Sequence, residues 1–581
     1  MSCMIPAQDG MVVSTTDTEA VKMRSLVIEW LMLNHPHDCP VCDEGGECQL
    51  HDYTVAGGHG IRRYKGKKRT HLNQYLGDRI EHEMNRCIQC YRCVRFYQDF
   101  AGGDDFGVMG RANLVYFGRK DAGALESQFS GNLVDVCPTG VFTDKTARFR
   151  ARYWDYDMAP SVCPHCSLGC NTTPAARYRE LLKTIARRND AVNGWFICDK
   201  GRFSNSQVNS PERPRSPVLD GEKVSWDQAL EALVQRVGEV TAQYGAGSIA
   251  LVGSPRMSLE GTVLLERLAA SLKAGALCYF IGVAEAETTM AAVSLLNGQK
   301  ARSMADVRAA DCIAVFNCDL LEEGPMMALA VRQAWRNGAK IVLVGTCSSS
   351  ERKNLPFEFS VVNVIDEVPF AECKSPVIIC GTASADIAAV RKAAEAPAGV
   401  AYVLNGPNAF GAALLAVESQ SPAFSQALAG GKIKGVIAFE ADLPPDLPAG
   451  VELLAVADWL PTAGSRQAGI FLPVTAHVEM EGTFINNEGR AQRFRKAMNP
   501  GLPIKGLDPA LHPPRMHEQS APGGDMRPSW QVIAALIERF GGEKVVEPLD
   551  GKWEPLRNLD PEGEGVRIGQ MAMGEGQMAK P

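Results

Sequence analysis

The sequence has 581 residues, of which 45% are hydrophobic and 22% charged, and its 60 basic and 67 acidic side chains give a net charge of −7. This length predicts several domains with at least one large core, and the slightly acidic charge argues against a nucleic-acid-binding protein. We find no apolar stretch of 18 or more residues and no secretory signal, so we expect no transmembrane segment. The informative residue is cysteine, because 12 of the 18 cysteines fall within the first 198 residues.

The first predicted element is a helix that begins near residue 16 and ends before Pro36. The sequence Thr16-Asp-Thr-Glu19 has the pattern of a capping box, which commonly opens a helix. The face predicted to be buried carries Leu26, Val27, Trp30 and Leu31. Because Pro36 ends the helix, His35 leaves it at the beginning of the first group of cysteines.

The first candidate ligand group combines three cysteines with one histidine. It consists of His35, Cys39, Cys42 and Cys48. Three thiolates and one imidazole can hold a tetrahedral zinc ion or a [4Fe–4S] cluster, and Gly45 and Gly46 allow a tight fold around either. We favour the iron–sulfur cluster, with zinc as the alternative.

Two further groups have the spacing of iron–sulfur ligands. The second group is Cys87, Cys90 and Cys93 with the distant Cys137, and the third is Cys163, Cys166 and Cys170 with the distant Cys198. Three closely spaced cysteines completed by a remote one are typical of [4Fe–4S] ligation, whereas zinc sites usually pair two C-x2-C knuckles. Since a series of redox centres moves electrons, three such groups indicate electron transfer. The alternative from another class is a non-redox scaffold held together by structural metal ions.

The six later cysteines stand singly in apolar, strand-like segments. Free cysteine behaves as a small hydrophobic side chain that is often buried. We therefore expect core packing for Cys278, Cys312, Cys318, Cys347, Cys373 and Cys380.

From about residue 214 onward, short apolar runs alternate with amphipathic helices. The predicted strands are 249–253, 312–316, 341–344, 377–379, 401–404, 436–439 and 453–456. Predicted helices begin at Ser225 with a capping box, run from Pro325 to Gly338, and cover Trp530 to Phe540. Buried strands that alternate with helices predict parallel sheets in a doubly wound α/β domain. Residues 507–528 are predicted to form a loop, and residues from about 560 a mobile tail.

Motifs of nucleotide-binding and hydrolytic sites are missing from the sequence. We find no G-x-x-x-x-G-K-[ST] or G-x-G-x-x-G phosphate-binding motif, and no H-E-x-x-H or G-x-S-x-G motif. We therefore predict no complete catalytic site in this chain, and we expect the electron donor and acceptor sites to lie on other chains.

The three ligand groups, in this order and with this histidine, resemble those of the G subunit of respiratory complex I, the NADH-quinone oxidoreductase. The segments 198–202 and 481–492 resemble parts of the molybdopterin-oxidoreductase fold. The resemblance implies an α/β multidomain protein, with small iron–sulfur N-terminal domains before a molybdopterin-oxidoreductase-like doubly wound α/β domain. The implied parts are a remnant of a [2Fe–2S] ferredoxin-like domain at 1–14, a histidine-ligated [4Fe–4S] domain at 15–65, an all-cysteine [4Fe–4S] domain at 66–155, a molybdopterin-type [4Fe–4S] domain at 156–213, the α/β domain at 214–510, and a C-terminal helix and tail at 511–581.

The resemblance also implies a function. Such a protein carries electrons from an NADH- and FMN-binding subunit toward a ferredoxin-like subunit and finally quinone, so this chain would meet NADH and quinone only through partners. It implies three [4Fe–4S] clusters, no molybdenum, and a peripheral position on the cytoplasmic face of the bacterial inner membrane. Cys3 resembles one ligand of the [2Fe–2S] domain without its three partners, so we assign no cluster to it.

One related alternative has a different activity. The catalytic subunits of molybdenum- or tungsten-dependent formate dehydrogenases share the same order of clusters. That function would require a bound pterin and metal, and a longer C-terminal pterin-binding domain than residues 500–581 provide.

Overall fold

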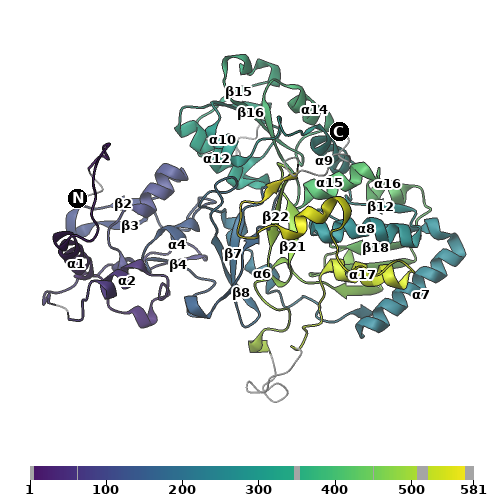
Figure 1. Ribbon diagram of the computed structural model, residues 1–581, viewed down its shortest axis with the longest axis horizontal. Coiled ribbons are helices and arrows are strands. Elements are labelled where there is room, and N and C mark those ends of the chain that lie inside the picture. Colours follow the sequence, from purple (N-terminus) through teal and green to yellow (C-terminus); the bar gives the residue numbers. More distant parts are fainter. Residues whose placement is uncertain (1–4, 62, 346–353, 449, 507–520, 569–581) are drawn as a thin grey trace. The chain divides into compact units, whose positions relative to one another are not determined.

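The computed structural model describes residues 5–61, 63–345, 354–448, 450–506 and 521–568 (Figure 1). The chain divides into two compact units, one made of Met1–Asp99 and Gly103–Asp155 and the other of Phe100–Gly102 and Tyr156–Pro581. The division after Asp155 falls at one of the domain boundaries predicted from the sequence. The finer boundaries remain predictions.

The smaller unit contains short elements joined by long loops. Its helices are α1 (Thr18–Met32), α2 (Gln49–Ala56), α3 (Arg92–Val94) and α4 (Asn132–Val136). Two antiparallel pairs join β1 (Ile80–His82) to β4 (Phe142–Asp144) and β2 (Phe106–Met109) to β3 (Tyr116–Arg119). The Phe106 ring lies 5.3 Å from that of Tyr97 and 5.6 Å from that of Phe142, measured between centroids. These buried aromatic rings form a small core that connects the two pairs.

The first helix differs from its prediction at the cap and on its apolar face. Asp17, and not Thr16, is the N-cap, since its carboxylate accepts hydrogen bonds from the backbone N–H groups of Glu19 and Ala20. Of the described side chains in this helix, Ile28 alone is buried, and Trp30 is 57% exposed. The prediction of a buried face through Val27 and Trp30 was therefore wrong.

The larger unit begins with a four-stranded antiparallel sheet. The strands are β5 (Asp157–Met158), β6 (Ser161–Val162), β7 (Asn171–Arg177) and β8 (Glu180–Ala186), and β7 pairs with each of the others. Two short helices follow, α5 (Asp199–Arg202) and α6 (Asn205–Val208). The turn between β6 and β7 and the start of α5 contain the third group of predicted ligands.

Two larger sheets form the α/β part of this unit. A seven-stranded sheet has the order β10-β9-β20-β19-β18-β11-β12, and a wholly parallel five-stranded sheet has the order β15-β14-β13-β16-β17. The first sheet contains β9 (Val218–Leu219), β10 (Glu222–Lys223), β11 (Ile249–Val252), β12 (Ala276–Cys278), β18 (Gly435–Phe439), β19 (Leu453–Asp458) and β20 (Ile470–Pro473). The second contains β13 (Cys312–Phe316), β14 (Lys340–Val344), β15 (Ser360–Val362), β16 (Pro376–Gly381) and β17 (Gly399–Val403). All seven predicted strands are present, and each pairs in parallel with its neighbours in these two sheets, whereas β9 pairs antiparallel with β10 and β20.

Helices alternate with these strands along the chain. They are α7 (Trp226–Tyr244), α8 (Leu259–Leu272), α9 (Val283–Leu295), α10 (Met304–Ala309), α11 (Leu320–Glu323), α12 (Pro325–Arg336), α14 (Ile387–Glu395), α15 (Ala409–Glu418), α16 (Phe424–Ala429) and α17 (Ser529–Arg539). Ser225 and Gln228 form the predicted capping box of α7, and Pro325 opens α12 as predicted. The predicted doubly wound α/β fold class is therefore confirmed.

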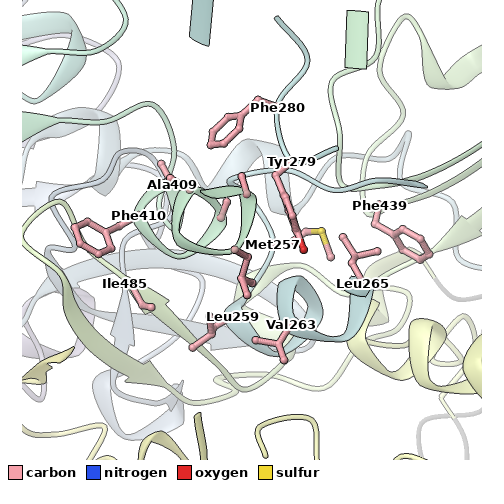
Figure 2. Close-up of a cluster of buried hydrophobic side chains, with 14 of the residues drawn as sticks. Met257, Leu259, Val263, Leu265, Tyr279, Phe280, Ala409, Phe410, Phe439 and Ile485 are labelled. Carbon is pink, nitrogen blue, oxygen red and sulfur yellow. The ribbon is translucent and has the colours of Figure 1, made fainter. Parts of the chain in front are cut away.

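The main core of the larger unit is built from several separate segments (Figure 2). It brings together side chains from α8, α15 and β18 with residues that follow β11 and β12. Figure 2 shows Met257, Leu259, Val263, Leu265, Tyr279, Phe280, Ala409, Phe410, Phe439 and Ile485 in this core. Because Ile485 belongs to β21 (Gly482–Ile485), the core also holds a further, three-stranded sheet in place.

This three-stranded sheet contains the last described strand of the chain. It consists of β21, β22 (Arg490–Phe494) and β23 (Val566–Arg567) in that order. The predicted mobile tail from about residue 560 is therefore wrong at its beginning, since 566–567 pair with β22. Residues 507–520 of the predicted loop and 569–581 of the predicted tail lie outside the described residues. Within the described part of the chain, no helix combines the length and apolar character that crossing a bilayer requires.

Candidate metal centres

The first predicted ligand group lies in the loop between α1 and α2. Cys39 begins a 3₁₀ turn (Cys39–Val41), and Cys48 is the N-cap of α2, where its sulfur accepts a hydrogen bond from the backbone N–H of His51 at 3.4 Å. His35, Cys39 and Cys48 line one cavity of about 270 Å³. Three of the four predicted ligands of this group therefore face a common space.

The fourth member, Cys42, is buried beside the loop that follows Cys137. A Cβ atom added at Gly140 would lie 2.4 Å from the Cys42 sulfur, so only glycine fits at this position. Burial raises the pKa of the Cys42 thiol to about 11, although the nearby Arg86 charge acts in the opposite direction. The structure therefore places the Cys42 sulfur against the loop that follows Cys137.

His35 has the properties of a ligand rather than of a surface histidine. It is 8% exposed, and its Nδ1 atom is buried without a hydrogen-bond partner. Burial lowers the pKa of His35 to about 4, so the imidazole is neutral at pH 7 and keeps a lone pair for a metal. The ammonium group of Lys68 donates a hydrogen bond to the His35 carbonyl and holds its backbone in place.

The second group lies in a loop with an unusual backbone. Cys87 follows a 3₁₀ turn (Met84–Arg86), and Gln89 and Tyr91 have left-handed φ values of 57° and 63°. These two residues fold the C-x2-C-x2-C segment back on itself, and the Gln89 backbone N–H donates to the Cys87 sulfur at 3.3 Å. Cys137 ends α4, so a helix positions the distant member of the group.

Electrostatic interactions show that the four thiols of this group lie near one another. Burial raises the pKa of Cys87 to about 12, and the Cys137 and Cys90 thiols raise it further. Burial, followed by Cys137, Cys87 and Cys90, likewise raises the pKa of Cys93. The structure therefore brings together all four members that the spacing predicts.

The third group is formed where β6, β7 and α5 meet. The Cys163 backbone N–H donates to the Cys170 carbonyl at 2.8 Å and closes the ligand loop, whose turn contains Gly169 at φ +68°. Cys198 is the N-cap of α5, and a Cβ atom added at Gly201 would lie 3.0 Å from the Cys163 sulfur and 3.8 Å from the Cys198 sulfur. Burial, followed by the other three thiols, raises the pKa of Cys170 well above its usual value. The four predicted ligands are therefore neighbours.

Residues from distant parts of the chain fix this third loop. The Asn487 N–H donates to the Ser167 carbonyl at 2.8 Å, and the Gln492 side-chain amide donates to the Gly169 carbonyl at 2.9 Å. The Leu404 N–H donates to the Ser167 hydroxyl at 2.9 Å. The loop is thus held by β22 and by the segments that precede β22 and follow β17.

Several features of the described residues fit iron–sulfur clusters in these places. Backbone N–H groups donate to the Cys48 sulfur in the first group and to the Cys87 sulfur in the second. Such hydrogen bonds stabilise the negative charge of cluster ligands, and the glycines at 140 and 201 leave room beside the sulfurs. Metal binding removes the thiol protons that burial otherwise retains.

No three His, Cys, Asp or Glu side chains among the described residues converge on a point where one metal ion could bind. A [4Fe–4S] cluster needs a wider arrangement, because each protein ligand binds a different iron atom. The hydrogen bonds to the Cys48 and Cys87 sulfurs, the glycines at 140 and 201 and the buried His35 imidazole fit such clusters.

Arg86 connects the first two groups, and its role could not be read from the sequence. It is 4% exposed, and its guanidinium donates to the Asp38 carboxylate at 2.7 Å and to the Gly140 carbonyl at 3.3 Å. Its own carbonyl accepts a hydrogen bond from the Thr139 hydroxyl at 3.0 Å. Since Asp38 lies in the first loop and Thr139 in the second, one buried arginine holds both loops together. A lone arginine before a cysteine has no distinctive pattern in a sequence.

Comparison with protein families agrees with this division into ligand groups. Residues 24–63 match the NADH-ubiquinone oxidoreductase-G iron–sulfur binding region, and residues 77–143 match the ferredoxin-like domain of NADH-quinone oxidoreductase subunit 3. Residues 157–210 match the Fe4S4 domain of molybdopterin oxidoreductases, and residues 219–360 match molybdopterin oxidoreductase. Iron–sulfur-binding regions therefore precede a molybdopterin-oxidoreductase region.

The chain is also similar to complete proteins, and not only to separate domains. The G subunit of the NADH-quinone oxidoreductase of Pseudomonas putida is 38% identical to this chain, over 86% of this chain and 63% of that protein. The corresponding protein of Escherichia coli K12 is 36% identical with the same coverage. Over most of its own length the chain is therefore similar to NADH-quinone oxidoreductase G subunits. It spans less than two thirds of the length of these relatives.

Solved structures add little to this assignment. Acetylene hydratase from Pelobacter acetylenicus matches with a TM-score of 0.39 and 13% identity, over 66% of this chain and 69% of that chain. At this TM-score the likeness supports no argument. Among the cysteines outside the ligand groups, Cys278, Cys312, Cys318 and Cys380 are buried as predicted, Cys373 is half-buried, and Cys3 and Cys347 lie outside the described residues.

Proposed function

We propose that this chain is an iron–sulfur electron-transfer subunit of an NADH-quinone oxidoreductase. In this proposal the chain holds three [4Fe–4S] clusters. The ligands are His35, Cys39, Cys42 and Cys48 for the first cluster, Cys87, Cys90, Cys93 and Cys137 for the second, and Cys163, Cys166, Cys170 and Cys198 for the third. The observation that carries the proposal is that all but one of these cysteines are buried or half-buried and that backbone N–H groups donate to the Cys48 and Cys87 sulfurs.

The residues of this chain have defined tasks in that function. A [4Fe–4S] cluster, when bound, supplies one-electron oxidation and reduction. Partial burial of the cysteine loops limits the access of water, and backbone N–H groups stabilise the charge on the sulfurs. The neutral His35 imidazole replaces a fourth thiolate, so the first ligand set carries one negative charge fewer than the other two.

The remaining parts of the proposal concern partners and position. We infer that an NADH- and FMN-binding subunit delivers the electrons and that a ferredoxin-like subunit takes them toward quinone. The missing nucleotide-binding motifs and the similarity to one component of a larger enzyme support this inference. We place the chain on the cytoplasmic face of the bacterial inner membrane, attached through the complex. We expect no molybdenum, and we assign no [2Fe–2S] cluster to Cys3.

Metal analysis of the anaerobically purified chain tests this function. We expect about twelve iron atoms per chain, no molybdenum, and separate [4Fe–4S] signals in the EPR spectrum of the dithionite-reduced protein. Molybdenum at about one atom per chain would instead indicate a formate dehydrogenase-like enzyme. Zinc without iron would indicate a structural scaffold.

Matched cysteine variants make the test specific. Cys170→Ser is expected to lower the iron content by about four atoms, because it removes one ligand of the third group. Cys278→Ser changes a cysteine that is equally buried but lies outside the groups, so the iron content is expected to stay the same. Equal iron loss in both variants would contradict the assignment.

A further inference from the structure

Two cysteines that are not proposed cluster ligands lie near each other at the five-stranded sheet. In the sequence, both come well after the last proposed ligand, Cys198. Cys312 begins β13, and Cys373 ends the 3₁₀ turn (Phe370–Glu372) that leads to β16. β13 and β16 are parallel neighbours, with Cys312 opposite Pro376. The pairing of these strands thus brings Cys373 to the beginning of β13, where its side chain packs against the core that contains Cys312.

A carboxylate holds the two cysteine-bearing segments together. Asp311, directly before Cys312, accepts hydrogen bonds from the backbone N–H groups of Lys374 at 2.7 Å and Ser375 at 2.9 Å. These N–H groups directly follow Cys373. The backbones on both sides of the cysteine pair are therefore fixed relative to each other, and the side chains have little freedom to separate.

The two thiols are close enough to affect each other. After burial, the Cys373 thiol raises the pKa of Cys312, and the Cys373 thiol donates to the Pro369 carbonyl at 3.3 Å. Cys312 is fully buried, whereas Cys373 is half-buried and can be reached from solvent. Because the backbones next to both cysteines are held together by the Asp311 hydrogen bonds, a disulfide requires only that the two side chains bring their sulfurs to about 2.05 Å.

We propose that Cys312 and Cys373 form a thiol pair that a small-molecule disulfide oxidises reversibly to an intramolecular disulfide. This modification site goes beyond the proposed electron-transfer function and does not depend on it. It joins the start of β13 covalently to the segment before β16.

The oxidation proceeds by two thiol–disulfide exchanges. The Cys373 sulfur attacks the small-molecule disulfide, loses its proton, and releases the first small thiol as a mixed disulfide forms. The Cys312 sulfur then attacks the Cys373 sulfur, loses its proton, and releases the second small thiol. The protein gives up two electrons and two protons, and the small-molecule disulfide becomes two thiols.

The order of these steps follows from burial. Burial raises the pKa of Cys312 to about 12, so Cys312 stays protonated and inaccessible until a mixed disulfide forms beside it. Cys373 is the member of the pair that an external disulfide can reach. Cys278 and Cys380 are both fully buried and serve as comparisons, since an external disulfide cannot reach either of them in the folded chain.

Peptide mass spectrometry of the full, cluster-loaded chain tests the pair. The protein is incubated anaerobically with oxidised glutathione, its free thiols are blocked in denaturant, and it is digested without reductant. We expect a linked 312–373 peptide pair in several-fold excess over any other cysteine pair, and its disappearance after dithiothreitol. An unlinked Cys312 beside a Cys373 that carries only glutathione would overturn the proposal, as would two unmodified thiols.

Two variants complete the test. Cys373→Ser is expected to leave Cys312 unmodified, whereas Cys380→Ser is expected to leave the 312–373 link intact. A glutathione-modified Cys312 in the Cys373→Ser variant would contradict the assigned order. Iron measured in the same samples is expected to stay constant, so failure of this proposal is distinct from failure of the cluster assignment.

Discussion

Arg86 is a buried positive charge beside the first proposed centre, and its removal gives a testable prediction. In Arg86→Gln, the Asp38 and Glu83 carboxylates lose their buried cationic partner. The added negative field disfavours an additional electron, so we expect the midpoint potential of the histidine-ligated cluster to fall by on the order of 50 mV. EPR-monitored redox titration measures this value.

Two controls separate charge from structure in that experiment. Arg86→Lys keeps the positive charge and is expected to retain most of the potential. Arg188→Gln removes an exposed ion pair with Asp190 and is expected to change nothing. A potential in Arg86→Gln equal to that of the unmodified protein would show that the guanidinium field does not reach the cluster.

Glu440 gives the α/β part a pH-dependent stability. It is 4% exposed and accepts a hydrogen bond from the Ser529 hydroxyl at 2.6 Å. Burial raises the pKa of Glu440 from 4.5 to about 7, so the folded state favours the protonated form. The stability that this preference provides is complete below pH 4.5 and is lost as the pH rises through 7, with a total of about 3 kcal/mol.

Replacement of this carboxyl group tests the prediction. Glu440→Gln cannot ionise and retains an oxygen for Ser529, so its free energy of unfolding is expected to fall less than that of the unmodified protein between pH 5 and pH 8. Denaturant unfolding at both pH values measures the difference. Glu231→Gln on the exposed side of α7 is the control, and an identical pH profile for Glu440→Gln and the unmodified chain would exclude this role.

At the scale of residues, the sequence identifies candidate ligands, but it does not identify the residues that pack around them. The cysteine groups are recognisable because ligand chemistry requires fixed spacing along the chain. Arg86 and Gly140 act through neighbours that only folding brings close, Asp38 for the first and the Cys42 sulfur for the second. Nothing in the local sequence of either residue indicates these contacts.

Among the elements, the short helix α5 depends on one small residue. Gly201 lies in α5 and faces the sulfurs of Cys163 and Cys198. In Gly201→Ala the new methyl group would crowd the Cys163 sulfur, so we expect loss of the third cluster and a decrease of about four iron atoms per chain. Iron analysis and the EPR spectrum of the reduced protein report this loss.

Gly238→Ala is the matched control for that variant. Gly238 lies within α7, and a Cβ atom added there meets nothing within 4 Å. Alanine favours a helix more than glycine does, so the control is expected to keep all its iron and to gain roughly 0.5–1 kcal/mol of stability. Full iron content in Gly201→Ala would contradict the proposed space for the cluster.

The prediction of strands succeeded where both faces of the strand are buried. Strands such as β13 and β16 lie inside a parallel sheet, so their apolar runs are continuous and visible in the sequence. The prediction failed for α1, because Thr16 and Asp17 are adjacent candidates for the cap and the apolar side chains of this helix are largely exposed. A sequence shows that a face is apolar but not whether anything covers it.

For the whole molecule, composition and motif order predict the order of the regions along the chain. They do not predict the hydrogen bonds by which distant segments hold one another. The order of the iron–sulfur-binding regions, the α/β sheets and the similarity to G subunits agree with expectation, whereas the individual ligands remain predictions. The dependence of the Cys163–Cys170 loop on Asn487 and Gln492 could not be predicted, since these residues are separated by more than three hundred positions. Only the folded topology brings them together.

The late anchoring of that loop has a consequence for biosynthesis. Residues 163–170 leave the ribosome long before Asn487 and Gln492 are translated, so the nascent loop exists for a time without the hydrogen bonds that later secure it. The loop takes its final shape only when the strand that bears Gln492 has been made. For the proposed third cluster, iron and sulfide would therefore reach these cysteines either while the loop still lacks these hydrogen bonds or after the complete chain has formed them.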